Sequence, residues 1–179
     1  MKVKIENIVS SITLGQDINL EEFANSVKEV DNPERFPGVI FRLDKPKLAM
    51  LIFRTGKVIC SGARSKDEIN IAVNTLLKKF REAGITISRI PDIEIQNIVA
   101  SSNLDFRVNL DALAMDCINT EYEPEQFPGL IFRLDDPKTV MLVFRSGKII
   151  VTGAKTPHDA ERAAEITRNT IKNTSAIIK

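Results

Sequence analysis

The side chains with the clearest chemistry in this sequence are lysines and arginines gathered in two blocks. Residues 36–64 hold six of these cations against one acid, and residues 127–155 hold five against two acids, giving charges of +5 and +3. The whole chain of 179 residues has a formal charge of only +1, so the remaining residues sum to −7. Cations concentrated on one part of an acidic body are typical of a surface that contacts phosphate groups. The ordinary alternative is solvated charge at strand edges.

Groups suited to catalysis or metal binding are few. An enzyme needs convergent acids and bases, and the single histidine, His158, stands near a predicted helix start, where a solvated role is expected. Cys60 and Cys117 form no CxxC pair and are predicted to be buried thiols of a reducing compartment. We therefore expect no metal, no cofactor and no small-molecule substrate. No apolar run approaches the ~20 residues of a membrane helix, and no signal-peptide pattern is present, so no membrane partner is expected.

The two basic blocks are copies of each other, because three segments of the sequence return later in the chain. The matching segments are 36–43 with 127–134 and 50–63 with 141–154, at an offset of 91, and 5–9 with 95–99, at an offset of 90. The chain is therefore predicted to consist of two repeats, residues 1–90 and 91–179, joined too tightly to be independent domains. Two copies are too few for a solenoid, which favours a pseudo-twofold pair sharing one surface.

Each repeat is predicted to hold the same order of elements. A first strand, at 4–10 or 94–101, leads to a helix capped by Asn19 or Asn109. Further strands follow at 39–43, 48–53 and 58–61, and again at 130–134, 140–144 and 149–152. The last two strands of each set are joined by a hairpin loop that contains glycine.

A long amphipathic helix is predicted to close each repeat. Ser65 with Glu68 forms a capping box in the first copy, and Thr156 caps the second helix with Pro157 at its first position. Apolar residues at helical spacing after Ser65 predict a face that packs on the sheet.

The predicted strands are apolar on both faces. Alternate residues of 48–53 place leucine, methionine and isoleucine on one face and alanine, leucine and phenylalanine on the other. Two helices per repeat can cover only one face of an antiparallel sheet, so the second face needs another covering. A core between two sheets and a dimer interface are ordinary possibilities, and a carrier of a lipid-like ligand would explain the apolar face but not the doubled cationic rim. A large apolar patch rimmed by Arg and Lys also suits a binder of the DNA minor groove.

Four motifs occur in the same order in both repeats: an (E/Q)NIV strand, an FPGxIFRL block, an FR(S/T)GK hairpin and an (S/T)GA(K/R) strand end. Together they resemble the TATA-box-binding protein family over essentially the whole chain. The resemblance implies an α+β fold, a pseudo-twofold saddle in which two repeats form one curved ten-stranded antiparallel sheet with four helices on the convex face. It also implies a general transcription factor, and not an enzyme, that binds and bends the TATA-box element of double-stranded DNA through the minor groove. The lack of a long N-terminal extension resembles archaeal members more than eukaryotic ones. It implies a cytoplasmic or nucleoid location in an archaeon, and a nuclear one if the protein is eukaryotic.

The resemblance assigns DNA-kinking roles to two phenylalanine pairs, Phe36 with Phe53 and Phe127 with Phe144. The alternative for each ring is ordinary core packing, which the neighbouring Pro-Gly disfavours for the two loop residues. The other residues that the resemblance places at the bases are Val9, Val99, Leu51, Leu142, Ile59, Ile150, Ser61, Thr152, Pro37 and Pro128. Those that it places at phosphates are Arg42, Thr55, Lys57, Arg133, Lys138, Ser146, Lys148 and Lys155.

Asn7 and Asn97 match the central amides of the family, which donate to the N3 and O2 acceptors that an A·T pair offers in the minor groove. The alternative is that each amide satisfies backbone groups at a strand end. Cys60 is expected to face the helices instead.

The loop before Phe127 is the one that binds the B-type general transcription factor in the family, and through that factor RNA polymerase is reached. Glu123 and Glu125 match the acidic contact residues of this loop. Gln126 departs from the apolar residue of eukaryotic members, and residues 173–179 lack the acidic tail of some archaeal members.

Overall fold

The computed structural model describes residues 1–178, which group into two compact units. The first-repeat unit contains residues 7–96, and the second-repeat unit contains residues 97–178 together with residues 1–6. Strands β1 (Lys4–Thr13) and β6 (Asp92–Asn103) contribute residues to both units.

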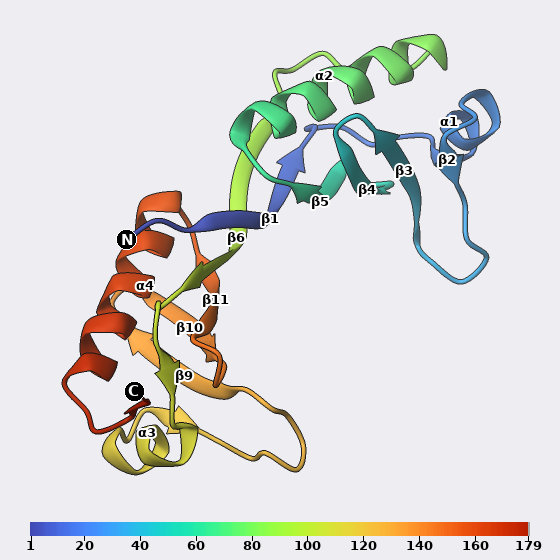
Figure 1. The fold of residues 1–179 in the computed structure, drawn as a ribbon. Coiled ribbons are helices and arrows are strands. Elements are labelled where there is room, and N and C mark those ends of the chain that lie inside the picture. Colours follow the sequence, from blue (N-terminus) through green and yellow to red (C-terminus); the bar gives the residue numbers. More distant parts are fainter. Residues whose placement is uncertain (179) are drawn as a thin grey trace. The chain divides into compact units, whose positions relative to one another are not determined.

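In the first-repeat unit, four consecutive strands stand between two helices along the chain. Its elements are α1 (Leu20–Ser26), β2 (Val30–Asp31), β3 (Gly38–Asp44), β4 (Lys47–Phe53), β5 (Lys57–Ala63) and α2 (Lys66–Glu82). Helix α2 lies along one face of β3–β5 (Figure 1). Three buried rings join the layers, because Phe23 of α1 packs against Phe80 of α2 at 4.6 Å between centroids and against Phe41 of β3 at 6.0 Å.

The second-repeat unit repeats this order and adds one short strand pair. Its elements are β7 (Arg107–Val108), α3 (Leu110–Asp116), β8 (Thr120–Glu121), β9 (Leu130–Asp135), β10 (Lys138–Val143), β11 (Lys148–Ala154), α4 (Pro157–Lys172) and β12 (Ile177–Ile178). Helix α4 packs on β10 and β11 (Figure 1). Small residues on α4, Ala160, Ala163 and Ala164, are buried and allow a close approach to these strands.

Ten strands follow the order β2-β3-β4-β5-β1-β6-β11-β10-β9-β8 in one antiparallel sheet, and β12 pairs with β7 separately. Four helices and a ten-stranded antiparallel sheet confirm the predicted fold class. The β7–β12 pair was not predicted, because two-residue strands have no periodicity to detect. Predicted strand ends differ from the observed ones by up to three residues, most at β1, which continues to Thr13.

The predicted helix caps are present in all four helices. Asn19 and Asn109 accept hydrogen bonds from backbone N–H groups at 3.1 Å, as Ser65 and Thr156 do for α2 and α4. The capping box at Ser65 is incomplete, because Glu68 accepts from the backbone N–H of Arg64 rather than from that of Ser65. No helix among residues 1–178 is both long and apolar enough to cross a membrane.

The two cysteines differ in environment. Cys60 is fully buried on the helix side of β5, as predicted, and burial raises the pKa of its thiol to about 11, an effect that the nearby Ser10 side chain only partly offsets. Cys117 is only half-buried, so the prediction of a buried thiol there was wrong. It follows the last residue of α3, where the end of a short helix leaves its side chain partly in solvent. Desolvation and the adjacent Asp116 carboxylate raise the pKa of this thiol.

Candidate nucleic-acid interface

One face of each unit's strands is packed under helices, and the other is only half-covered. In the first-repeat unit Leu48, Met50 and Ile52 of β4 are buried, whereas the alternate residues Leu51 and Phe53 are partly exposed. The strands of the second-repeat unit alternate in the same way. We call the partly exposed side the open face.

The open face of each unit carries a cross-strand row of aliphatic side chains. In the first-repeat unit the register places Ile40 opposite Leu51 and Leu51 opposite Ile59. In the second-repeat unit the equivalent row is Ile131, Leu142 and Ile150. Sequence reasoning included the last two members of each row but missed Ile40 and Ile131. Both isoleucines occupy the same position of the FPGxIFRL motif, and each stands between two buried residues of its strand. This alternation was the signal that could have identified them.

Asn7 lies beside this row at an irregularity of the sheet. Between the pairs Ile8 with Ala63 and Ser10 with Cys60, β5 has one residue more than β1, which is a β-bulge. The extra residue, Gly62, has a φ of 110°, a conformation that favours glycine. Its backbone N–H donates to Asn7 Oδ1 at 2.6 Å.

This bond fixes which way the Asn7 amide points. Because Oδ1 must face the Gly62 N–H, the amide NH₂ is on the other side, where Nδ2 donates to Ser61 Oγ at 3.3 Å. An amide NH₂ has two hydrogens, and no residue among 1–178 accepts the second one. One N–H donor of the Asn7 amide is therefore available to a ligand.

Asn97 has the same arrangement in the second-repeat unit. Its Oδ1 accepts from Gly153 N at 2.6 Å, and its Nδ2 donates to Thr152 Oγ1 at 3.2 Å. The bulge again places one extra residue, Gly153 with a φ of 99°, in β11 opposite β6. Each amide thus does satisfy a backbone group, as the alternative interpretation held, and at the same time presents a donor. The two bulge glycines are site residues that sequence reasoning missed, although the repeated (S/T)GA motif marked them.

Four phenylalanines form two contacting pairs, in the predicted combinations. The ring centroids of Phe36 and Phe53 are 5.6 Å apart, and those of Phe127 and Phe144 are 5.9 Å apart. None of these rings is buried, and Phe127 is 39% exposed. The rings are therefore not part of the core of either unit.

Glycine is needed beside each pair, for different reasons. A Cβ at Gly129 would meet the rings of Phe127 and Phe144 at 2.7 and 3.0 Å. A Cβ at Gly38 would instead meet the backbone oxygen of Ile52 at 2.5 Å. The Pro-Gly of the motif thus lets a ring lie directly over the chain, and Pro37 and Pro128 are themselves exposed next to the rings.

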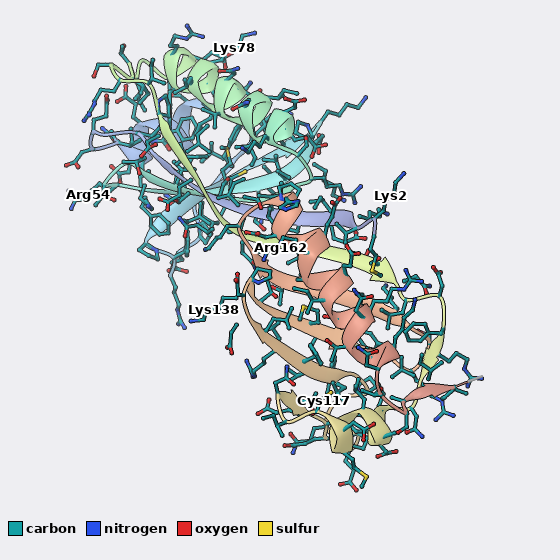
Figure 2. All side chains as sticks on the ribbon, turned by 90° about the vertical axis from the view of Figure 1, so that its left-hand side faces the viewer. Lys2, Arg54, Lys78, Cys117, Lys138 and Arg162 are labelled. Carbon is teal, nitrogen blue, oxygen red and sulfur yellow. The ribbon has the colours of Figure 1, made fainter. Side chains whose placement is uncertain are left out.

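The predicted phosphate-contacting residues are all exposed. Lys57 and Lys148 stand two residues before open-face isoleucines on β5 and β11, so they share that face. Lys138 begins β10 and extends from the sheet (Figure 2). Lys155 follows β11, and the hydroxyls of Thr55 and Ser146 lie in the hairpin turns.

Arg42 and Arg133 already have carboxylate partners, which the sequence did not predict. Arg42 Nη1 lies 3.2 Å from Asp31 Oδ2, and Arg133 Nη2 lies 3.3 Å from Glu121 Oε2. All four side chains are more than half exposed, and such pairs contribute only about 0–1 kcal/mol. A phosphate can therefore displace these carboxylates.

The loop before Phe127 is tied to that ring through its backbone. The carbonyl of Glu123 accepts from the N–H groups of Gln126 and Phe127 at 2.9 and 3.0 Å. The side chains of Glu123, Glu125 and Gln126 are exposed, so this acidic loop is open to a partner.

Each unit thus presents an apolar row, one oriented amide donor, a pair of exposed rings and a cationic border. This combination suits a partner that is apolar at its centre and anionic along its sides.

Comparisons with known proteins give the family. The family model described as "Transcription factor TFIID (or TATA-binding protein, TBP)" matches residues 2–83 and residues 92–174. The TATA-box-binding protein of Methanocaldococcus jannaschii is 49% identical over 172 residues, which cover 96% of this chain and 94% of that protein. That of Methanothermobacter thermautotrophicus is 49% identical over 93% of this chain and 92% of its own length. The solved structure of Methanococcus jannaschii TBP superposes with a TM-score of 0.90, covering 96% of this chain and 99% of that one.

The chain belongs to the TATA-binding protein family, and its relatives named above are archaeal. The resemblance drawn from four repeated motifs is therefore confirmed.

Proposed function

We propose that this protein is a general transcription factor that binds an A·T-rich TATA element through the minor groove of double-stranded DNA and bends it. The observation that carries the proposal is the oriented amide of each unit, whose carbonyl is occupied by a bulge N–H and whose NH₂ points away beside an apolar row. Each repeat, 1–90 and 91–179, contributes one such amide and apolar row.

The minor-groove edge of an A·T pair has only acceptors, N3 and O2, whereas a G·C pair adds the guanine N2 donor. An amide NH₂ that faces the floor of the minor groove can donate to the A·T acceptors. Opposite a G·C pair it meets the guanine N2 amino group, which is also a donor. The only side-chain acceptors of the apolar floor are the hydroxyls of Ser61 and Thr152, which already accept from the Asn7 and Asn97 amides. Its predicted members are Val9, Leu51, Ile59 and Ser61 in one unit and Val99, Leu142, Ile150 and Thr152 in the other.

Bending follows from the exposed ring pairs. Rings that are not needed in the core can insert between base steps as apolar wedges, and the TATA-binding proteins are themselves a standard example of such minor-groove binders. We assign this role to Phe36 with Phe53 and to Phe127 with Phe144.

Phosphates on both sides of the groove are contacted by the cationic border. Arg42, Lys57, Arg133, Lys138, Lys148 and Lys155 supply the charge, and Thr55 and Ser146 supply hydroxyl donors. On DNA binding, Arg42 and Arg133 exchange a carboxylate for a phosphate.

The exposed acidic loop is proposed to recruit the B-type general transcription factor through Glu123 and Glu125, and RNA polymerase through that factor. The protein then acts on DNA in the cytoplasm or nucleoid. Its role is binding and recruitment, without catalysis.

A gel shift with an A·T-rich duplex in the presence of a G·C-rich competitor tests the proposal. We expect a retarded complex that the G·C duplex does not displace at equal concentration. Equal competition by the two duplexes would reject minor-groove reading of A·T pairs. A carrier of apolar ligands would instead bind a fluorescent apolar probe and leave the duplex unshifted.

A further inference from the structure

A hollow of about 720 Å³ lies within the second-repeat unit, where the start of β1 meets the end of β6, the start of β11 and helix α4. Four cationic side chains line it, Lys2, Lys4, Lys148 and Arg168, together with one carboxylate, Asp105. Figure 2 shows Lys2 at the start of β1, and Figure 1 shows this end of the chain beside α4.

Most of this positive charge is not neutralised by the protein. Lys4 Nζ lies 4.0 Å from Glu6 Oε1, a long ion pair. Lys2, Lys148 and Arg168 form no ion pair with any residue among 1–178. Three cations therefore face a hollow whose one lining carboxylate is Asp105.

Arg168 adds a second, independent observation. Its Nε is buried and has no hydrogen-bond partner among the described residues. Glu165, one turn earlier on α4, lies 3.8 Å from the backbone ammonium of Met1 instead. A buried charged donor without an acceptor is costly, and native structures usually supply one. A guanidinium with neighbouring ammonium groups is a preferred arrangement for phosphate.

The same place in the first-repeat unit repeats only one of these four cations, since Lys57 corresponds to Lys148. At the offset of 90, Lys2 and Lys4 correspond to Asp92 and Glu94, which lie in the first-repeat unit. At the offset of 91, Arg168 corresponds to Leu77, which lines a hollow of about 640 Å³ in the first-repeat unit whose one cationic side chain is Arg89. The shared fold therefore does not require Lys2, Lys4 or Arg168.

We propose that the hollow bounded by Lys2, Lys148 and Arg168 is a phosphate-binding site. A doubly charged phosphate group fits three unpaired cations better than a single carboxylate does. The phosphate comes either from a free polyphosphate or from the backbone of DNA that flanks the element, and the second source rests on the proposed function. Lys148 connects the hollow with the open face, because it lines the hollow and is also a predicted phosphate contact of that face.

The test is titration with inorganic tripolyphosphate at low salt, where charge interactions are little screened. Arg168→Leu and Lys2→Asp introduce the residues that stand at the equivalent positions of the first-repeat unit, Leu77 and Asp92. Lys78→Leu and Lys78→Asp are the matched controls, because Lys78 is exposed on α2 of the other unit (Figure 2). We expect the site variants to lose about tenfold or more in affinity, as charge-assisted hydrogen bonds do when removed, and the controls to match wild type. In NMR spectra the Nε–H signal that Arg168→Leu removes is expected to shift on titration.

A second arm compares a duplex of the element alone with one extended by flanking DNA. If the phosphate comes from DNA, the flanks raise the affinity of wild type and of the Lys78 variants but not of the site variants. If only tripolyphosphate binding is lost, the source is a free phosphate compound. Equal effects of site and control variants in both arms overturn the proposal. Lys2→Asp keeps the test valid if Arg168→Leu fails to fold, and the tripolyphosphate arm decides even if wild type binds no DNA.

Discussion

Replacing Asn97 by Asp separates the two functions that the structure gives this amide. The carboxylate keeps an oxygen for the Gly153 N–H, which now lies 2.6 Å from Asn97 Oδ1, but it removes both N–H donors. The β-bulge should therefore persist, and the melting temperature of the free protein should stay close to wild type. Asn97→Ala, by contrast, leaves the Gly153 N–H without its acceptor. That loss should destabilise the free protein by about 1–3 kcal/mol, or roughly 2–4 °C per kcal/mol for a chain of this size.

Asn97→Asp, which should leave the stability of the free protein almost unchanged, should nevertheless weaken DNA binding strongly. In the proposed complex, Asn97→Asp exchanges a donor facing adenine N3 or thymine O2 for an acceptor, which leaves a buried base acceptor unpaired. A penalty of about 1–3 kcal/mol weakens binding to an A·T element roughly 5- to 150-fold. The matched control is Asn109→Asp, since the side chain of Asn109 also accepts a backbone N–H, from Ala112, and lies at the N-cap of α3. This control adds the same charge to the same unit and should change affinity little.

The decisive measurement is a cycle of dissociation constants at one salt concentration. Wild type and Asn97→Asp are each measured on the A·T element and on duplexes in which one pair at a time is G·C. Wild type should lose about 1–3 kcal/mol at the pair that this amide reads, and Asn97→Asp should lose less there, because a carboxylate accepts from the guanine N2 amino group. Equal weakening on all duplexes would refute base reading and leave Asn97 only the role of holding the bulge.

Four further outcomes follow from the same geometry. With about six cations each neutralising one phosphate, log K should fall against log[salt] with a slope of about −5, and a slope near zero would reject the cationic border. Phe144→Ala should reduce bending measured by energy transfer while costing the free protein much less than the ~3–5 kcal/mol of a truncated core ring; a loss of that size would return the ring to the core. Gly38→Ala should lower the melting temperature more than Gly129→Ala, because its Cβ meets backbone rather than movable rings, and the reverse order would contradict the ring geometry. At pH 8 the native protein should be alkylated at Cys117 but not at Cys60, whose pKa is raised to about 11, so mass spectrometry should find one modified thiol before unfolding and two after it.

The raised pKa of Cys60 also sets a direction for stability in alkaline solution. The folded state keeps this thiol protonated up to about pH 11, whereas the unfolded thiol ionises near its usual value of 9.0. The folded state therefore binds more protons between these values, and its stability falls as pH rises through this window and is unaffected by this group below it. Denaturation of Cys60→Ala beside wild type should show a smaller decline over the same window.

The sequence by itself determined the repeat, the order of elements, the helix caps and the family. These features are encoded locally, because alternation along a strand, helical spacing and a cap each involve residues within a few positions of one another. The exposure of the four phenylalanines was also anticipated. Pro-Gly beside Phe36 and Phe127 signalled loops rather than core, and alternation placed Phe53 and Phe144 on the face that the helices leave uncovered.

Only the tertiary structure decided how the amides point, how the arginines are paired and where the phosphate hollow lies. Asn7 is 55 residues from the glycine that orients it, and Arg42 is held by a carboxylate on a neighbouring strand. The hollow at Arg168 depends on residues 1–6 packing within the unit built from 97–178, more than 90 residues away in sequence. Contacts at such separations arise from strand pairing and register, which no local pattern specifies, and they decide which side chains come together in one site.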